Sequence, residues 1–168
     1  MNKHLVPMLL VLLGILSLAA PAQLPITVAN PDFTGPESVM ALIPPSISVK
    51  KGGKLNAVAA SQATDAMKAG AIGKIGQFKV KLKKLENTRD HGAKFFLHAE
   101  ADKLAFRGDR YEYHIRSFFA ADQADDLSKL REGATVTVVG RIIRSDIAAP
   151  GEGEKFIITM QDCHLVAR

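Results

Sequence analysis

The chain has 168 residues, 47% of them hydrophobic and 23% charged, which is ordinary for a globular protein. Its formal net charge of +5 permits association with nucleic acid, anionic lipid or acidic glycan and selects none of them. The single cysteine, Cys163, excludes an intramolecular disulfide.

Residues 1–22 have the pattern of a secretory signal peptide. Lys3 precedes an apolar or small-residue run over 8–20, and Ala20 to Ala22 form an A-x-A-type cleavage site. The run of about 13 residues is shorter than the roughly 20 that cross a bilayer as a helix. We therefore expect cleavage before Gln23, export to the periplasm or the extracellular space, and no stable membrane span afterwards. An uncleaved anchor is the alternative. No Cys follows the run, which excludes lipoprotein attachment.

Residues 23–54 are predicted to be a proline-rich linker. Seven of the eight prolines fall at or before Pro45. Proline fixes φ and removes a hydrogen-bond donor, so we expect an extended, irregular segment up to Ser46. A spacer is favoured over a segment that docks on a partner, because a dense apolar pattern is lacking.

Residues 55–73 are predicted to form a short helix and a joint. Asn56 is a plausible N-cap, Ala-rich sequence follows to Ala69, and Gly70 is expected to end the helix. A weak apolar stripe indicates packing on the next domain; its members are Leu55, Val58, Ala59, Ala66 and Met67. The glycines around Lys74 lack the spacing of a phosphate-binding loop.

Residues 74–168 are predicted to form one β-barrel domain. Phe78, Val80 and Leu82 alternate with lysines, as in a strand with one buried face. Turn residues then separate four further strands and one short helix. Strands are expected over 94–106, 111–120, 135–144 and 156–166, and the helix over 122–130.

The resulting order, β-β-β-α-β-β, is that of a five-stranded OB-fold, so the expected class is all-β with small helices. Gly140 lies inside the fourth strand, where the absence of a side chain permits the strong coil of a small barrel.

The C-terminal half also resembles the bacterial tRNA-anticodon-binding-like OB family. The resemblance rests on four runs: Phe118-Phe119-Ala120, Leu127-Ser128-Lys129-Leu130-Arg131-Glu132-Gly133, Val136-Thr137-Val138-Val139-Gly140-Arg141 and the closing Asp162-Cys163-His164-Leu165-Val166. It covers roughly the last 50 residues, and its motifs are structural. The resemblance implies an OB-fold named for its similarity to nucleic-acid binders, and it specifies no activity.

No catalytic or metal-binding pattern stands out. His91, His98, His114 and His164 are scattered, without chelating spacing. Cys163 and its neighbour His164 point to opposite faces of a strand, so Cys163 is expected to be a small buried residue. We therefore expect a protein that is not an enzyme and that carries neither metal nor cofactor.

Basic and imidazole side chains on the first three strands form the candidate ligand-binding face, since OB-folds bind ligands on the face of strands two and three. Against a phosphate ligand, the loop between strands four and five carries Asp146, Glu152 and Glu154 with only Lys155. A solvated strand face is the plainer interpretation of the lysines. The candidates are Lys79, Lys81, Lys83, Arg89, His98, His114 and Arg116.

Three function classes follow. An exported, non-enzymatic module that binds a glycan, peptide or protein is favoured. Nucleic acid is the alternative partner: the lysine row supports it, whereas the acidic loop and the few surface aromatics oppose it. An enzyme ranks third, for want of a convergent acid, base or nucleophile.

Overall fold

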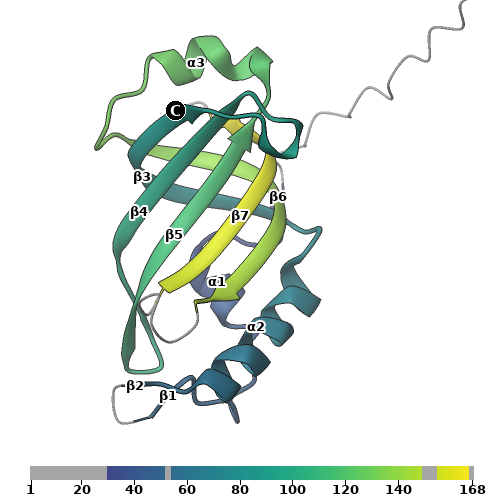
Figure 1. Cartoon of the computed structure of the whole chain (residues 1–168), viewed down its shortest axis with the longest axis vertical. Helices are drawn as coiled ribbons and strands as arrows, with labels where there is room; N and C mark the ends of the chain where they lie inside the picture. Colours follow the sequence, from purple (N-terminus) through teal and green to yellow (C-terminus); the bar gives the residue numbers. More distant parts are fainter. Residues whose placement is uncertain (1–29, 52–53, 149–154, 167–168) are drawn as a thin grey trace, which may run out of the picture.

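A computed structural model describes residues 30–51, 54–148 and 155–166 of the chain (Figure 1). The predicted signal peptide and most of the predicted loop between the last two strands lie outside the described residues. Among the described residues, no helix is both long enough and apolar enough to span a bilayer.

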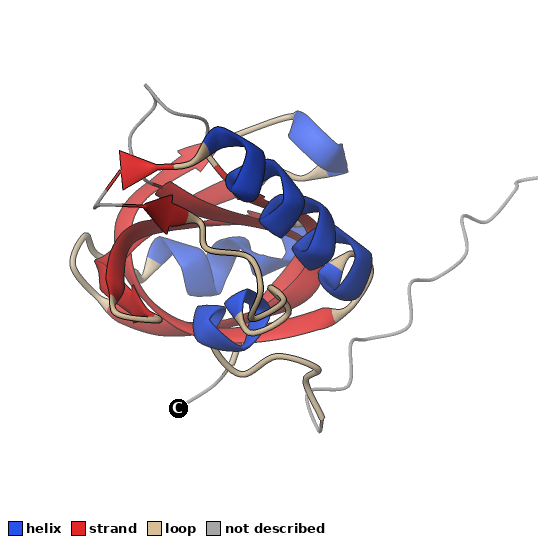
Figure 2. Cartoon of the chain, turned by 90° about the horizontal axis from the view of Figure 1, so that it is seen from below, coloured by secondary structure: helices blue, strands red, loops and turns tan. Residues whose placement is uncertain are grey.

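Five strands close into a barrel, which Figure 2 shows as a ring with helices across its opening. Around the barrel the order is β3-β4-β5-β7-β6, and every pair is antiparallel except β5 with β7, which is parallel. This is the OB arrangement, and it confirms the predicted strand order. The bounds are β3 Ile75–Asn87, β4 Phe95–Phe106, β5 Asp109–Phe119, β6 Thr135–Ile147 and β7 Lys155–Leu165.

The predicted alternation holds in β3, where Phe78, Val80 and Leu82 are buried and the intervening lysines are exposed. Alternating side chains point to opposite faces, so one face of each strand fills the barrel. The interior also contains Leu97, Tyr111, Ile115, Phe119, Val138, Ile142, Phe156, Ile158, Met160 and Cys163.

A short helix lies between the third and fourth strands, as predicted. It comprises a 3-10 turn, Ala121–Gln123, and α3, Ala124–Ser128, and Leu127 from α3 is buried in the core. The loop between β3 and β4 also holds a 3-10 turn, Asp90–Gly92. Figure 1 shows α3 at one end of the barrel and the N-terminal elements at the other.

Gly140 lies within β6 at a bulge between Val139 and Arg141. A Cβ atom at this position would lie 2.6 Å from the Sγ atom of Cys163 and 3.0 Å from the carbonyl oxygen of Gln161. The requirement for glycine therefore comes from the close approach of β7, in agreement with the expected strong coil.

The proline-rich segment differs from its prediction. Its described part is not an extended spacer: Pro36–Met40 form the helix α1, and Val39, Met40 and Ile43 are fully buried. Proline is tolerated in the first turn of a helix, so Pro36 does not prevent α1 from forming. Before α1, Phe33 forms a parallel bridge with Gly76 of β3.

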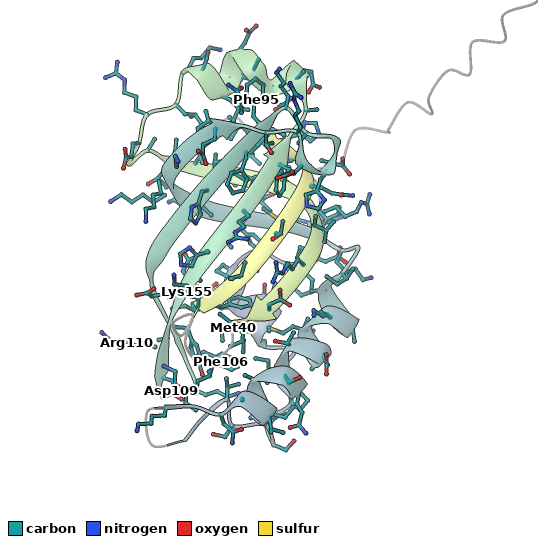
Figure 3. The ribbon with its side chains drawn as sticks, in the orientation of Figure 1. Met40, Phe95, Phe106, Asp109, Arg110 and Lys155 are labelled. Carbon is teal, nitrogen blue, oxygen red and sulfur yellow. The ribbon has the colours of Figure 1, made fainter. Side chains whose placement is uncertain are left out.

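An arginine at the β4–β5 turn holds this segment in place. Arg107 donates hydrogen bonds to the backbone carbonyls of Ile43, Pro44 and Ile47. The turn consists of Arg107 and Gly108, with φ of 49° and 83°, as in a tight hairpin. Figure 3 places Met40 at this end of the molecule, where Asp109 and Arg110 also lie.

The helix α2, Ala57–Ala71, starts as predicted, because the Oδ1 atom of Asn56 accepts hydrogen bonds from the backbone amides of Val58 and Ala59. It continues past Gly70, whose missing side chain admits Leu42. The buried face agrees with the prediction at Ala59 and Met67 and differs at Val58, which is 69% exposed; Ala60, Ala63 and Ala71 complete the buried face. A small hairpin, β1 Lys50–Lys51 and β2 Lys54–Leu55, precedes α2.

Candidate functional site

A row of rings lies on the outer face of β4 and β5. Phe96 is in register with Phe118, and their ring centroids are 5.0 Å apart. His91, from the 3-10 turn, contacts the edge of Phe118 at 4.7 Å, and His98 stacks on Phe96 at 6.1 Å. His114 continues the row, with its ring 5.2 Å from that of His98. Five rings from three segments therefore form one surface.

The two imidazoles at the end of the row opposite His91 are hydrogen-bonded to each other. The Nε2 atom of His98 lies 2.9 Å from the Nδ1 atom of His114. His114 is only 7% exposed, whereas His98 is half-buried. One of these two nitrogens must carry a hydrogen and donate it while the other accepts, so a single hydrogen lies between the facing nitrogens.

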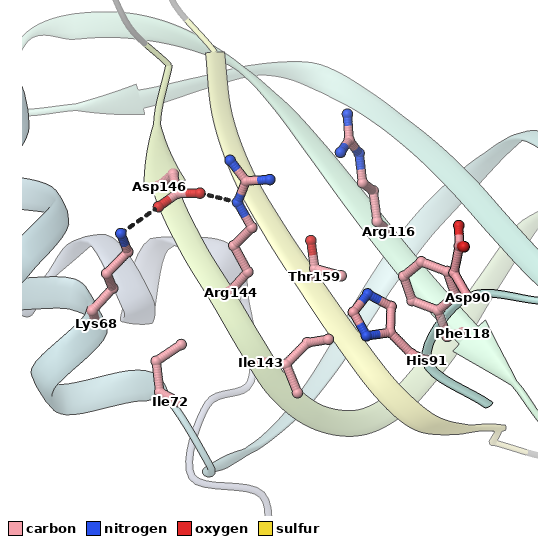
Figure 4. Close-up of a pocket in the computed structure, with 10 residues that line it drawn as sticks. All are labelled: Lys68, Ile72, Asp90, His91, Arg116, Phe118, Ile143, Arg144, Asp146 and Thr159. Carbon is pink, nitrogen blue, oxygen red and sulfur yellow. Dashed lines mark hydrogen bonds and ion pairs between the residues drawn. The ribbon is translucent and has the colours of Figure 1, made fainter. Parts of the chain in front are cut away.

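A groove continues from the rings across the barrel. One hollow, of about 260 Å³, is bordered by the ring row and Arg116, and it shares Asp90, Arg116 and Phe118 with a larger hollow of about 660 Å³. The larger hollow extends over Thr159 of β7 and Arg144 of β6 to α2 (Figure 4). The groove therefore crosses β4, β5, β7 and β6.

Cations are distributed along this groove. Arg116 lies in register with His98, beside the rings, and Arg144 lies in register with Thr159. At the far end, Asp146 binds the Nζ atom of Lys68 at 3.1 Å and also the guanidinium of Arg144. The sequence places Asp146 in an acidic loop that is expected to repel phosphate. Because two cations contact it, its charge is neutralised locally.

The structure divides the predicted basic residues into two groups. It brings His98, His114 and Arg116 together on the ring face. Lys79 and Lys81 lie in register with Thr137 and Thr135 of β6, away from β4. Lys79 instead borders a separate hollow of about 890 Å³, which we call the lysine hollow; it is also lined by Lys129, Leu130, Arg131, Val136 and Leu165.

The division follows from the change of partner along β3, which pairs with β6 over 75–81 and with β4 from Leu82 onward, with a bulge between Leu82 and Lys84. Lys83 is exposed at the bulge, and Lys84 lies in register with His98. Arg89 is exposed beside the 3-10 turn that carries His91. The assignment of these residues to ligand binding stays a prediction.

Sequence reasoning missed several residues of the groove, chiefly Phe96, Phe118 and Arg144. The alternation in 95–99 was a usable signal, since Leu97 and Ala99 are buried and Phe96 and His98 must then point outward. Lys68 could not have been found in this way, because α2 reaches the groove only through the tertiary fold.

Cys163 is buried, as predicted, and burial raises the pKa of its thiol well above the ordinary value, so the thiol stays protonated. Within the described residues, no three His, Cys, Asp or Glu side chains are grouped to hold a metal ion.

No protein-family model matches the chain. No curated protein matches it either. Among solved structures, the chain is similar to a putative nucleic acid-binding lipoprotein from Klebsiella pneumoniae, with a TM-score of 0.39 and 16% identity, over 62% of this chain and 78% of that one. It is also similar to Rim1, a mitochondrial single-stranded DNA binding protein from S. cerevisiae, with a TM-score of 0.33 and 16% identity, over 56% of this chain and 96% of that one. Scores this low assign neither a family nor a ligand.

Proposed function

We propose that the chain is an exported, non-enzymatic OB-fold protein that binds single-stranded nucleic acid in the groove across β4, β5, β7 and β6. The observation that carries this proposal is the contact row of Phe96, Phe118 and His91 directly beside Arg116. Proteins hold single strands without sequence preference by stacking bases on aromatic rings and tracking phosphates with cations.

The groove offers both stacking rings and cations, arranged along one path that a single strand could follow. Bases stacked on the ring row would place the adjoining phosphates over Arg116, and the strand would continue toward Arg144 and Lys68. Each stacked base contributes about 1–3 kcal/mol in comparable sites, so two stacking positions would contribute about 2–6 kcal/mol, to which a phosphate contact with Arg116 would add.

This ranking reverses the preference for a glycan, peptide or protein ligand. That preference depended on a scarcity of surface aromatics and on an acidic loop. The rings of Phe96, His98 and His91 line the outer face, and Asp146 is paired with two cations. Glu152 and Glu154 lie outside the described residues.

A neutral oligosaccharide is the second candidate. Aromatic rings also stack on sugar faces, and the carboxylate of Asp90 borders both hollows, where it can accept hydrogen bonds from hydroxyl groups. Sugar binding would depend little on salt, because no counterions are released.

The test is a fluorescence-anisotropy titration of a short labelled oligothymidine at low and moderate salt, with neutral oligosaccharides as competitors. We expect affinity that falls as salt rises, no competition by sugars, and a loss in Arg116→Gln. If oligothymidine binding does not depend on salt and a neutral sugar displaces the oligonucleotide, the groove binds oligosaccharide instead. Absence of oligothymidine binding at low salt would refute the proposal.

Export and the tRNA-anticodon-binding-like family stay parts of the proposal. Export is supported by the sequence of residues 1–22 alone. N-terminal sequencing of protein recovered from the cell envelope or medium should begin near Gln23. Recovery of intact Met1 from the cytoplasm would contradict export and leave the groove proposal untouched.

A further inference from the structure

We infer that Arg116, Thr159 and Arg144 form a binding site for one phosphate group on the outer face of β5, β7 and β6. The site follows from the strand register and from the contacts of these side chains. That its occupant is a phosphate of a nucleic-acid strand rests on the proposed function, since free phosphate or a small phosphomonoester offers the same chemistry.

The strand register places the three residues on one line across the barrel. Arg116 of β5 is in register with Thr159 of β7, and Thr159 is in register with Arg144 of β6. In-register residues of neighbouring strands point to the same face of a sheet, and all three residues line the larger hollow of the groove. Neighbouring strands lie about 4.8 Å apart, so the backbones of the two arginines flank that of Thr159 at about this distance on either side.

Thr159 forms the floor of the site. The residue is only 5% exposed, and Figure 4 shows its hydroxyl oxygen between the side chains of Arg116 and Arg144. A hydroxyl donates one hydrogen bond, and a guanidinium donates several from a planar fork. Donors that converge from three strands suit a tetrahedral oxyanion, whose oxygens point in different directions. A carboxylate fits less well, because its two oxygens lie in one plane and match a single arginine fork.

Arg144 is held in position before a ligand arrives. Its side chain is 54% exposed, but its Nε atom donates a hydrogen bond to the carboxylate of Asp146, whose side chain is only 12% exposed. Asp146 is also bound by Lys68 of α2, with 3.1 Å between Nζ and Oδ1. The bond to Asp146 engages the Nε edge of the guanidinium, so the Nη groups can donate to an oxyanion. A side chain that is ordered in advance loses less entropy when a ligand binds.

The charges that line the hollow favour a weak, exchangeable site. Lys68, Arg116 and Arg144 contribute three cations, and Asp90 and Asp146 contribute two carboxylates. The positive excess is therefore small, and free phosphate is expected to bind weakly. A phosphate within a strand is expected to bind more tightly, because stacking of the neighbouring bases on the ring row makes the phosphate contact intramolecular.

The test is a ¹H–¹⁵N NMR titration of the full chain with inorganic phosphate at neutral pH, with sodium chloride of equal ionic strength as the control. We expect saturable shifts of the Thr159 amide signal and of the Arg144 Nε–H signal, and smaller shifts with acetate. Shifts no larger than those with chloride would overturn the inference. Oligothymidine should shift the same two signals at lower concentration than phosphate does. If thymidine 5′-monophosphate binds as tightly as oligothymidine, the occupant is a small phosphomonoester.

Variants of the two arginines give the decisive comparison. Arg116→Gln and Arg144→Gln should each weaken phosphate binding about tenfold, through loss of hydrogen bonds between charged groups. Arg144→Lys should lose nearly as much, because lysine keeps the charge and lacks the planar fork. Arg131→Gln, at the lysine hollow, is the matched control with the same change of charge and should bind as the unmodified chain does. Circular dichroism checks that each variant is folded. Equal phosphate affinity in the three glutamine variants would overturn the inference.

Failure of this site and failure of the proposed function give different results. If oligothymidine binds in a salt-dependent way and phosphate leaves the Thr159 signal unchanged, the phosphate site is wrong and the groove proposal stands. If phosphate binds at the two arginines and oligothymidine does not bind at low salt, the site stands and the nucleic-acid proposal is wrong.

Discussion

The groove and the lysine hollow are both bordered by cations, yet they differ in what stands beside the charge. In the groove, Arg116 lies next to a contact row of rings, and the other two cations, Arg144 of β6 and Lys68 of α2, are both paired with Asp146. In the lysine hollow, Lys79 and Arg131 lie beside aliphatic side chains, and Lys129 is paired with Asp126 at 2.9 Å. Positive charge alone attracts any polyanion, whereas rings beside the charge add a stacking surface for bases. The comparison therefore supports the groove, rather than the lysine hollow, as the proposed ligand-binding surface.

The largest expected effect is a loss of barrel stability, which would disrupt the groove and the lysine hollow together. Gly140→Val should destabilise the barrel by about 3 kcal/mol, because a side chain there meets the Sγ atom of Cys163 and the backbone of β7. Urea denaturation followed by circular dichroism measures this loss. The matched control is Gly140→Ala made with and without Cys163→Ala: removal of the sulfur should recover part of the loss. Equal losses in both backgrounds would show that Cys163 is not what Gly140 accommodates.

The reactivity of Cys163 measures whether the barrel interior, on which both surfaces are built, stays closed to solvent. Burial raises the pKa of its thiol and removes it from solvent, so the native protein should resist alkylation by iodoacetamide at pH 8. Labelling followed by mass spectrometry should show reaction only after unfolding in the unmodified chain and faster reaction in Gly140→Val. Rapid labelling of the native chain would mean that this part of the barrel opens readily.

The next largest effect is on oligothymidine affinity, and it distinguishes the groove from the lysine hollow. Phe96→Ala and Arg116→Gln should each weaken oligothymidine binding about tenfold, through loss of a stacking ring and of a phosphate contact. Anisotropy titrations measure both, and Arg116→Gln should also flatten the dependence of affinity on salt. If neither variant changes the affinity, the groove is not the binding surface.

The smallest effect is expected in the lysine hollow. Lys79→Gln combined with Lys81→Gln should change the affinity by about twofold or less at moderate salt, because exposed charges at a distance are screened. The same titration provides the measurement. If the double variant lost more affinity for oligothymidine than Arg116→Gln does, the lysines of β3 would be the main binding residues.

The sequence predicted the barrel because β-strand alternation is local. Phe78, Val80 and Leu82 reveal the inner face of β3 without knowledge of any partner strand. The packing of Val39, Met40 and Ile43 was not predictable in this way. These residues stand among prolines, and the donor that fixes their segment, Arg107, lies 60 to 64 residues beyond its acceptors in the chain.

The ring row was hidden for a different reason. If strand pairing is counted from the two-residue turn at Arg107, Phe118 falls opposite Leu97, an inward residue. A bulge between Ala101 and Leu104 shifts the register by one, so Phe118 lies opposite Phe96 on the outer face. Because a one-residue shift moves every side chain to the other face, the candidate site depends on a feature that alternation cannot locate. The same shift brings His98 and His114 onto one face.

The hydrogen bonds of Arg107 also determine when this end of the molecule can be completed. They join positions 60 to 64 residues apart, and the bridge between Phe33 and Gly76 is long-range as well. Synthesis proceeds from the N-terminus, so the segment that contains α1 emerges well before the hairpin that secures it. Contacts between distant parts of a chain slow folding, because loop closure must precede them. The native contacts of the N-terminal apolar segment can therefore be completed only once the β4–β5 turn has formed.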